Sequence, residues 1–127
     1  MSHIRDKNTE PELRVRRFLH AAGLRYRLHV ADLPGKPDLV FRSRRVCIFV
    51  HGCFWHGCRK CADGRHRAKS NVAYWLNKIR RNRKRDLKNT RALVSQGWTV
   101  YVLWECETTG PSQIEKLQRA ILSHKPS

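Results

Sequence analysis

The segment that most restricts the fold is residues 46–50, which read VCIFV and are apolar at every position. A strand with one face in water alternates apolar and polar residues, whereas a strand covered on both faces is apolar throughout. The run therefore predicts a central, buried strand. Three further strands are expected: 24–30, where apolar and basic residues alternate; 38–41, after the turn sequence LPGKP; and 98–104.

Capping signals predict a helix before the first strand and another after the last one. Thr9 and Glu12 have the spacing of a capping box, and Gly23 is the stop signal of the first helix. Ser112 and Glu115 have the same spacing and predict the start of the last helix.

A long helix is expected between the third and fourth strands, capped by Ser70 or Asn71 and closed by Gly97. Its apolar stripe is expected to contain Trp75, Leu76, Ile79, Leu87, Leu93 and Val94. The resulting order, α-β-β-β-α-β-α, predicts a single α/β domain over residues 1–127 with a mixed central sheet.

The charge of the chain predicts a polyanionic partner. Its 127 residues contain 27 Lys and Arg against 10 Asp and Glu, a formal charge of +17. The basic residues are densest in 78–91, so nucleic-acid phosphates are the expected partner. The alternative is a solvated basic surface of the ribosomal-protein kind. Phosphate contacts are expected from Arg80, Arg81, Arg83, Lys84 and Arg85.

Several classes of protein are disfavoured. No apolar run approaches the roughly 18–20 residues of a membrane span, and the first ten residues lack the apolar stretch of a secretory signal. We therefore expect a cytoplasmic protein, associated with the nucleoid, rather than a membrane protein or a secreted disulfide scaffold.

The cysteine spacing predicts a structural zinc site. Three cysteines lie in one short loop as C-x4-C-x2-C, and a fourth follows the last strand. Four thiolates suit a closed tetrahedral Zn²⁺ site, whose predicted ligands are Cys53, Cys58, Cys61 and Cys106. His51, His56 or His66 could replace one thiolate. Cys47, inside a strand, is interpreted as a buried core residue.

A candidate catalytic group lies at the ends of two neighbouring strands. Asp38 enters one strand after the turn, and the next strand ends at Val50 and His51. Carboxylates at such positions hold Mg²⁺ against a phosphate, since this hard ion takes oxygen ligands. With no second carboxylate there, main-chain carbonyls and water would complete the shell. His56 is the candidate base, because imidazole titrates near neutrality.

Each of these residues also has a purely structural interpretation. Asp38 would stabilise its turn, His56 would ligate zinc, Glu12 would only close its capping box, and His51 would be a satisfied structural histidine. The aromatic pair Phe54–Trp55 has two interpretations as well: it wedges between base steps, or it packs over the zinc loop.

Taken together, the segments resemble the very-short-patch-repair (Vsr-type) DNA mismatch endonucleases. The matching pieces cover roughly residues 1–110 and are KNTEPELRVRRFLHAAGLRYRLH, LPGKPDLVF, VCIFVHGCFWHGC, YWLNKIRRNRKRD and GWTVYVLWEC. The resemblance implies a variant of the restriction-endonuclease-like fold. It also implies a Mg²⁺-dependent enzyme that nicks one strand 5′ to the T of a T·G mismatch, the product of 5-methylcytosine deamination.

The resemblance further implies residue roles at the scissile phosphate. The Asp38 carboxylate and the main-chain carbonyl of Val50 would bind Mg²⁺, and His56 would act on the water nucleophile. Glu12 and His51 would support the site. Val50 stands where some members have threonine, a change that a main-chain ligand tolerates.

Contacts to the mismatch are implied in the same way. Phe54 and Trp55 would intercalate with help from Met1, while Lys78 and Asn82 would contact the T·G pair. The family also has a structural zinc with one histidine ligand, near whose position this chain has Cys58.

A monomer with one active site would nick rather than break both strands. The alternatives are a restriction-like or defence nuclease of the same fold, and a non-catalytic, zinc-stabilised DNA-binding module.

Overall fold

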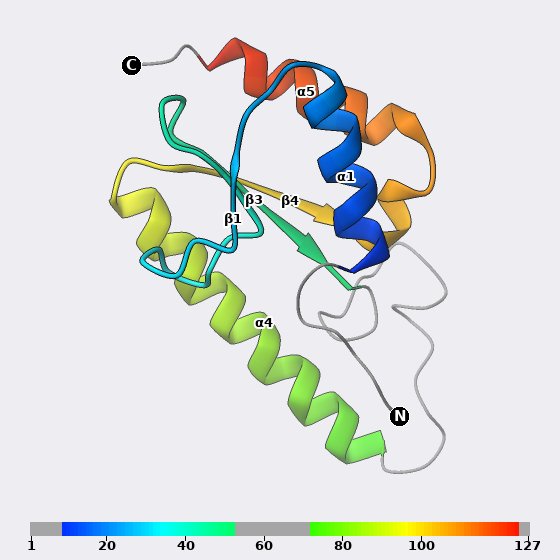
Figure 1. Cartoon of the computed structure of the whole chain (residues 1–127). Helices are drawn as coiled ribbons and strands as arrows, with labels where there is room; N and C mark the ends of the chain where they lie inside the picture. Colours follow the sequence, from blue (N-terminus) through cyan, green and yellow to red (C-terminus); the bar gives the residue numbers. More distant parts are fainter. Residues whose placement is uncertain (1–8, 53–71, 125–127) are drawn as a thin grey trace.

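The computed structural model describes residues 9–52 and 72–124, except the side chains of Val72 and Trp75. Figure 1 shows the helices and strands, which confirm the predicted order. They are α1 (Glu10–Ala21), β1 (Arg27–Leu28), β2 (Leu39–Phe41), β3 (Val46–His51), α4 (Val72–Ser95), β4 (Thr99–Trp104), the 3₁₀ helix η1 (Glu105–Thr108) and α5 (Pro111–Ser123).

The described strands form one mixed sheet in the order β1-β2-β3-β4. β1–β2 and β2–β3 are antiparallel, and β3–β4 is parallel, with Val46 opposite Thr99 and His51 opposite Trp104. β3 thus has a neighbour on each side and is the central strand that its apolar run predicts.

Helices cover the two faces of the sheet, and alternate strand residues point to each. Leu39, Val46 and Ile48 pack in a core with α1 and α5, whereas Val40 and Cys47 pack in a second core with Leu93 of α4. Figure 1 shows α4 on the opposite side of the sheet from α1 and α5. The protein is therefore a three-layer α/β/α domain in its described residues.

The apolar stripe predicted for α4 is partly wrong. Ile79 and Leu93 are buried, but Leu76, Leu87 and Val94 are 43–56% exposed. The 24 residues of α4 span about 36 Å at about 1.5 Å each, whereas the six residues of β4 span about 20 Å. Because α4 is longer than the sheet that it covers, its N-terminal half, with Leu76, extends beyond the strands (Figure 1). Leu87 and Val94 lie in the C-terminal half and are exposed because they are turned away from the face on which Leu93 is buried.

The first predicted strand is much shorter than expected. Only Arg27–Leu28 pair with β2, although the alternation covers residues 24–30. His29 ends the strand because its φ of 46° lies in the left-handed region, outside the β region. Leu24 and Val30 at the two ends of the segment are buried as the pattern predicts.

The helix caps are partly confirmed. The Thr9 side chain accepts a hydrogen bond from the Glu12 N–H, and Gly23 follows α1 with a φ of 87°. The capping box expected at Ser112 is wrong: α5 starts at Pro111, and its N-cap Gly110 makes no side-chain cap. Proline fits the first position of a helix, so the N-cap is Gly110 and the helix begins two residues earlier than expected.

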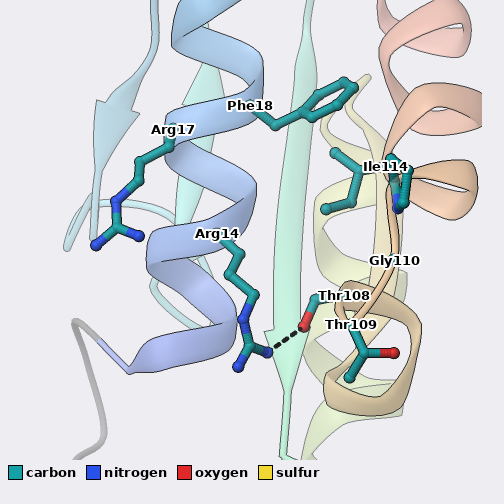
Figure 2. Close-up of a pocket in the computed structure, with 8 residues that line it drawn as sticks. Arg14, Arg17, Phe18, Thr108, Thr109, Gly110 and Ile114 are labelled. Atoms are coloured by element: carbon teal, nitrogen blue, oxygen red, sulfur yellow. Dashed lines mark hydrogen bonds between the residues drawn. The ribbon is translucent and has the colours of Figure 1, made fainter.

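α1 is attached to the last part of the chain. Arg14 donates a hydrogen bond to Thr108 Oγ1 of η1 at 3.2 Å, beside a hollow between α1 and α5 (Figure 2). Val15 and Leu19 of α1 pack in one core with Ile114 and Leu117 of α5. These contacts fix the helix whose first turn carries Glu12.

Among the described residues, no helix has the length and apolar character needed to cross a membrane.

Candidate active site

The first turn of α1 brings a buried carboxylate to the sheet. The Glu12 side chain is 2% exposed, and its Oε2 lies 2.8 Å from His29 Nε2 and 3.5 Å from Arg16 Nη1. The carboxylate of Glu12 therefore contacts side chains other than those of its helix cap.

Asp38 lies at the entry of β2 and is tied to β3. Its Oδ2 accepts a hydrogen bond from the main-chain N–H of Val50 at 2.7 Å. Burial raises the pKa of the Asp38 carboxyl from 3.8 to about 7; the Val50 hydrogen bond opposes this shift, and the nearby Glu12 carboxylate adds to it. Asp38 is thus more than a turn-stabilising residue.

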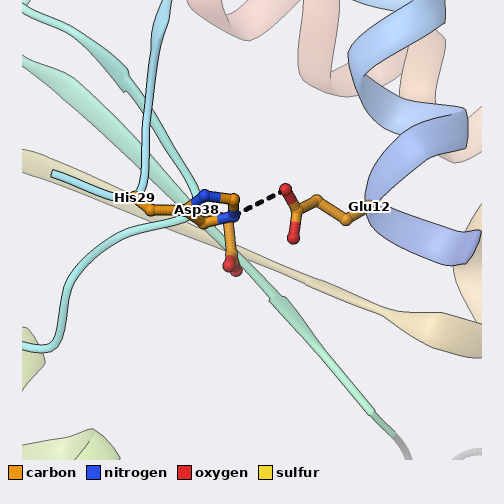
Figure 3. A group of neighbouring side chains, drawn as sticks. All are labelled: Glu12, His29 and Asp38. Carbon is orange, nitrogen blue, oxygen red and sulfur yellow. Dashed lines mark hydrogen bonds and ion pairs between the residues drawn. The ribbon is translucent and has the colours of Figure 1, made fainter. Parts of the chain in front are cut away.

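Glu12, His29 and Asp38 form a compact group. Each offers one ligand atom, and these atoms lie within 4.8 Å of one another (Figure 3). Sequence reasoning missed His29. This residue occupies a polar position in an alternating pattern, and nothing in the sequence indicates its left-handed backbone. The first turn of α1, the end of β1 and the entry of β2 meet here.

The donor set of this group fits a divalent cation. Two carboxylates supply the oxygen atoms that hard cations prefer. The two carboxylates also lie close together and Glu12 is buried, an arrangement that a cation between them would stabilise. The described residues therefore contain a candidate acidic metal site, at Glu12 and Asp38.

The end of β3 adds two of the predicted residues. Val50 is half-buried and packs against the core under α1, while its N–H holds Asp38. His51 is buried on β3, with its Nδ1 3.9 Å from Asp86 Oδ2 of α4 and its ring 5.3 Å from that of Trp104. The structure thus brings Glu12, Asp38, Val50 and His51 to one end of the sheet, where His51 lies beside Asp86 of α4.

α4 presents a strongly basic surface. Seven basic residues of α4 are exposed, and none of them forms an ion pair with a carboxylate among residues 9–52 and 72–124; they are Arg80, Arg81, Arg83, Lys84, Arg85, Lys88 and Arg91. Lys78 and Asn82 are half-buried on the same helix, and Arg85 donates to Asn82 Oδ1 at 3.1 Å. The exposed arginine and lysine side chains of α4 are therefore available to phosphates.

Several predicted site residues lie outside the described part of the chain. They are Met1, Cys53, Phe54, Trp55, His56, Cys58 and Cys61. Of the predicted zinc ligands only Cys106 is described; it is half-buried in η1, directly after β4. Cys47 is buried in β3 as predicted, and burial raises the pKa of its thiol to about 12.

Carboxylates at one end of a mixed sheet, in a domain with a basic helix, are characteristic of metal-dependent enzymes that cleave nucleic acids. The sequence model of the family described as "DNA mismatch endonuclease Vsr" matches residues 1–63. The chain belongs to this family, and it is a DNA endonuclease.

Individual relatives agree with this assignment. The chain is 50% identical over 122 residues to the type II nicking enzyme V.XorIIP of Xanthomonas oryzae pv. oryzae, covering 96% of this chain and 88% of that protein. It is 46% identical over 107 residues to the type II nicking enzyme V.NmeAIP of Neisseria meningitidis, covering 84% and 75%. The DNA mismatch endonuclease Vsr of Escherichia coli is 37% identical over 114 residues, covering 90% and 72%.

Proposed function

We propose that the protein is a Mg²⁺-dependent mismatch endonuclease that nicks one strand 5′ to the T of a T·G pair. The observation that carries the proposal is the convergence of Glu12 and Asp38 at the end of β3, in a chain of the Vsr family. Two of its relatives are a nicking enzyme and a DNA mismatch endonuclease, which supports cleavage of one strand at a mismatch.

The Asp38 carboxylate and the Val50 carbonyl would hold Mg²⁺, with Glu12 and His51 supporting them. Bound Mg²⁺ would polarise the scissile phosphate and stabilise its developing negative charge. Asp38 is positioned for this role by its hydrogen bond to the Val50 N–H, which fixes one oxygen on β3. His56 would take the proton of the attacking water.

DNA would lie along the basic surface of α4. Phosphate contacts there position a protein without reading the sequence, and Arg80, Arg81, Arg83, Lys84 and Arg85 would supply them. Lys78 and Asn82 would contact the T·G pair. Phe54 and Trp55, with Met1, would wedge into the stack, where a wobble pair costs less to deform than a Watson–Crick pair.

A structural Zn²⁺ on Cys53, Cys58, Cys61 and Cys106 would order the segment between β3 and α4. The position of Cys106 supports this proposal. His51 and Trp104 are paired in the sheet, and Cys53 and Cys106 each follow two residues later in the chain. We further propose that the protein acts as a monomer, because one active site per chain accounts for a nick. We also propose that it acts in the cytoplasm, associated with the nucleoid.

The test is a nicking assay on end-labelled duplexes that contain T·G or T·A within degenerate flanks, with Mg²⁺ or with EDTA. We expect a Mg²⁺-dependent nick at T·G that Asp38→Ala abolishes while DNA binding survives. Equal cleavage of the T·A duplex would contradict mismatch specificity and favour a restriction-like or defence nuclease. Tight binding without any cleavage would contradict the proposal as a whole.

The wedge is tested in the same assay. Phe54→Ala combined with Trp55→Ala should remove the preference for T·G over T·A. If the double variant keeps that preference, the pair does not read the mismatch.

A further inference from the structure

His29 connects the two carboxylate-bearing segments of the candidate site. Its Nε2 lies 2.8 Å from Glu12 Oε2, while its main-chain N–H donates to the carbonyl oxygen of Asp38 at 3.2 Å. Its side chain is 22% exposed, against 2% for Glu12. One residue therefore contacts the side chain of one proposed metal-site residue and the backbone of the other.

The backbone of His29 is held in a conformation that few residues adopt. Its φ is 46°, in the left-handed region, where histidine is tolerated better than most side chains. This turn ends β1 after Leu28 and directs the imidazole toward α1, as Figure 3 shows. The geometry is thus specific to this position rather than a property of an extended strand.

We propose that His29 is a positioning residue, which holds the Glu12 carboxylate beside Asp38 so that a divalent cation meets two oriented acidic groups. This inference rests on the proposed function, because it assigns His29 to the same metal site. In this arrangement Nε2 carries the hydrogen of the contact, because a carboxylate that binds a cation is ionised and only accepts hydrogen bonds. Nε2 then has no lone pair for the metal, and through this nitrogen His29 supports the site. Hydrogen-bonded supports of this kind orient metal-binding carboxylates.

Two variants distinguish an effect of the His29 side-chain hydrogen bond from an effect of its left-handed main chain. His29→Gln retains an N–H donor on a side chain long enough to approach Glu12. His29→Asn is tolerated in the left-handed region but is one methylene shorter, so it loses the contact. Glu12→Gln removes the charge that His29 is proposed to orient.

The first readout is the affinity of the DNA-free protein for Mn²⁺, followed by electron paramagnetic resonance and competed with Mg²⁺. We expect His29→Asn to weaken Mn²⁺ binding by about 10-fold or more, and His29→Gln to remain within about 3-fold of the parent protein. Glu12→Gln and the Glu12→Gln/His29→Asn double variant should be equally weak, since both changes disrupt one unit. Nicking should fall in kcat in the same order.

Two outcomes would overturn the inference. Unchanged Mn²⁺ affinity in His29→Asn would make His29 a bystander. A loss in His29→Gln as large as in His29→Asn would mean that the imidazole itself is required, as for a direct ligand. Failure of the proposed function is seen separately: if Asp38→Ala leaves Mn²⁺ binding intact, the metal site itself is misplaced. A different DNA substrate would change nicking but not these affinities.

Discussion

The side chain of Asp38 and the main chain of Val50 are joined by a hydrogen bond of 2.7 Å from the Val50 nitrogen to Asp38 Oδ2. Asp38 immediately precedes β2, and Val50 lies near the end of β3, so the bond crosses the two antiparallel strands. The bond orients the Asp38 carboxylate and partly offsets the free-energy cost of burying its charge. The proposed metal-binding carbonyl belongs to the same residue, Val50, as this N–H donor.

Asp38→Asn is expected to stabilise the metal-free protein at neutral and alkaline pH. The folded-state pKa of Asp38 is about 7, against an ordinary value of 3.8, so the folded chain binds this proton more tightly than the unfolded chain. The contribution of Asp38 to stability is therefore greatest below pH 4, declines as the pH rises toward 7, and is then constant. Relative to the parent protein, Asp38→Asn should gain about 1–3 kcal/mol at pH 8 and little at pH 4.

The measurement is urea unfolding in EDTA at pH 4, 6 and 8. Asp32→Asn is the control, because the Asp32 side chain is 70% exposed and pairs with Arg42 at the surface; its effect should be small at each pH. A constant difference between Asp38→Asn and the parent protein from pH 4 to 8 would contradict the raised pKa. Asp38→Asn should also lack nicking activity, whatever its stability.

Removing cations from α4 is expected to reduce the salt dependence of DNA binding. Arg81 and Lys84 are exposed on α4. The logarithm of the binding constant falls with the logarithm of salt concentration by about 0.9 per neutralised phosphate. The Arg81→Ala/Lys84→Ala variant should therefore give a slope that is less steep by about 1 to 2, measured by fluorescence anisotropy in EDTA.

A matched change on α5 controls for net charge. Lys116 and Arg119 are exposed on α5, on the other side of the sheet from α4. Their double alanine variant removes the same two charges but should leave the slope unchanged. Equal effects of the two double variants would indicate that DNA responds to the total charge and not to a surface on α4.

The sequence predicts much of the fold because its strongest signals are local. The apolar run 46–50 correctly indicates a strand covered on both faces, and residues on alternate sides of β3 do enter two separate cores. Thr9 correctly marks the start of α1 through its cap to the Glu12 N–H. Asp38, after its turn, lies as predicted at the start of β2, beside the end of β3.

The geometry that the sequence does not reveal depends on contacts between distant segments. The approach of His29 to Glu12 requires the left-handed φ of His29 and the packing of α1 on the sheet, neither of which has a sequence pattern. The exposure of Leu76 has a similar reason. Periodicity marks it as part of an apolar stripe but does not tell how far the sheet extends beneath α4.

Gly35→Ala should destabilise the protein more than Gly23→Ala. Both glycines have a positive φ, 77° and 87°, so alanine is strained at either position. A Cβ at Gly35 would also lie 2.9 Å from Nδ2 and 3.1 Å from Cβ of Asn89 on α4, whereas a Cβ at Gly23 meets nothing within 4 Å. We expect a loss of about 1 kcal/mol for Gly23→Ala and about 2–3 kcal/mol for Gly35→Ala by urea unfolding. Equal losses would show that the turn before Asp38 does not pack closely on α4.

Cys106→Ser should remove bound zinc and lower the melting temperature together, if the proposed zinc site is correct. Cys106 lies in η1 just beyond the end of β4, and β4 pairs at Trp104 with the end of the strand that leads to Cys53. A closed zinc site contributes directly to folding, so losing one ligand weakens both metal retention and stability. Zinc is measured by elemental analysis after dialysis, and melting is followed by circular dichroism.

Cys47→Ala provides the matched control for this prediction. The pKa of the Cys47 thiol is raised to about 12 by burial, so this group stays protonated at neutral pH, whereas zinc binds the thiolate. Cys47→Ala should therefore keep the zinc content of the parent protein while losing about 1 kcal/mol of core packing. A Cys106→Ser protein with full zinc content would exclude Cys106 as a ligand, and a Cys47→Ala protein without zinc would place the metal at β3 instead.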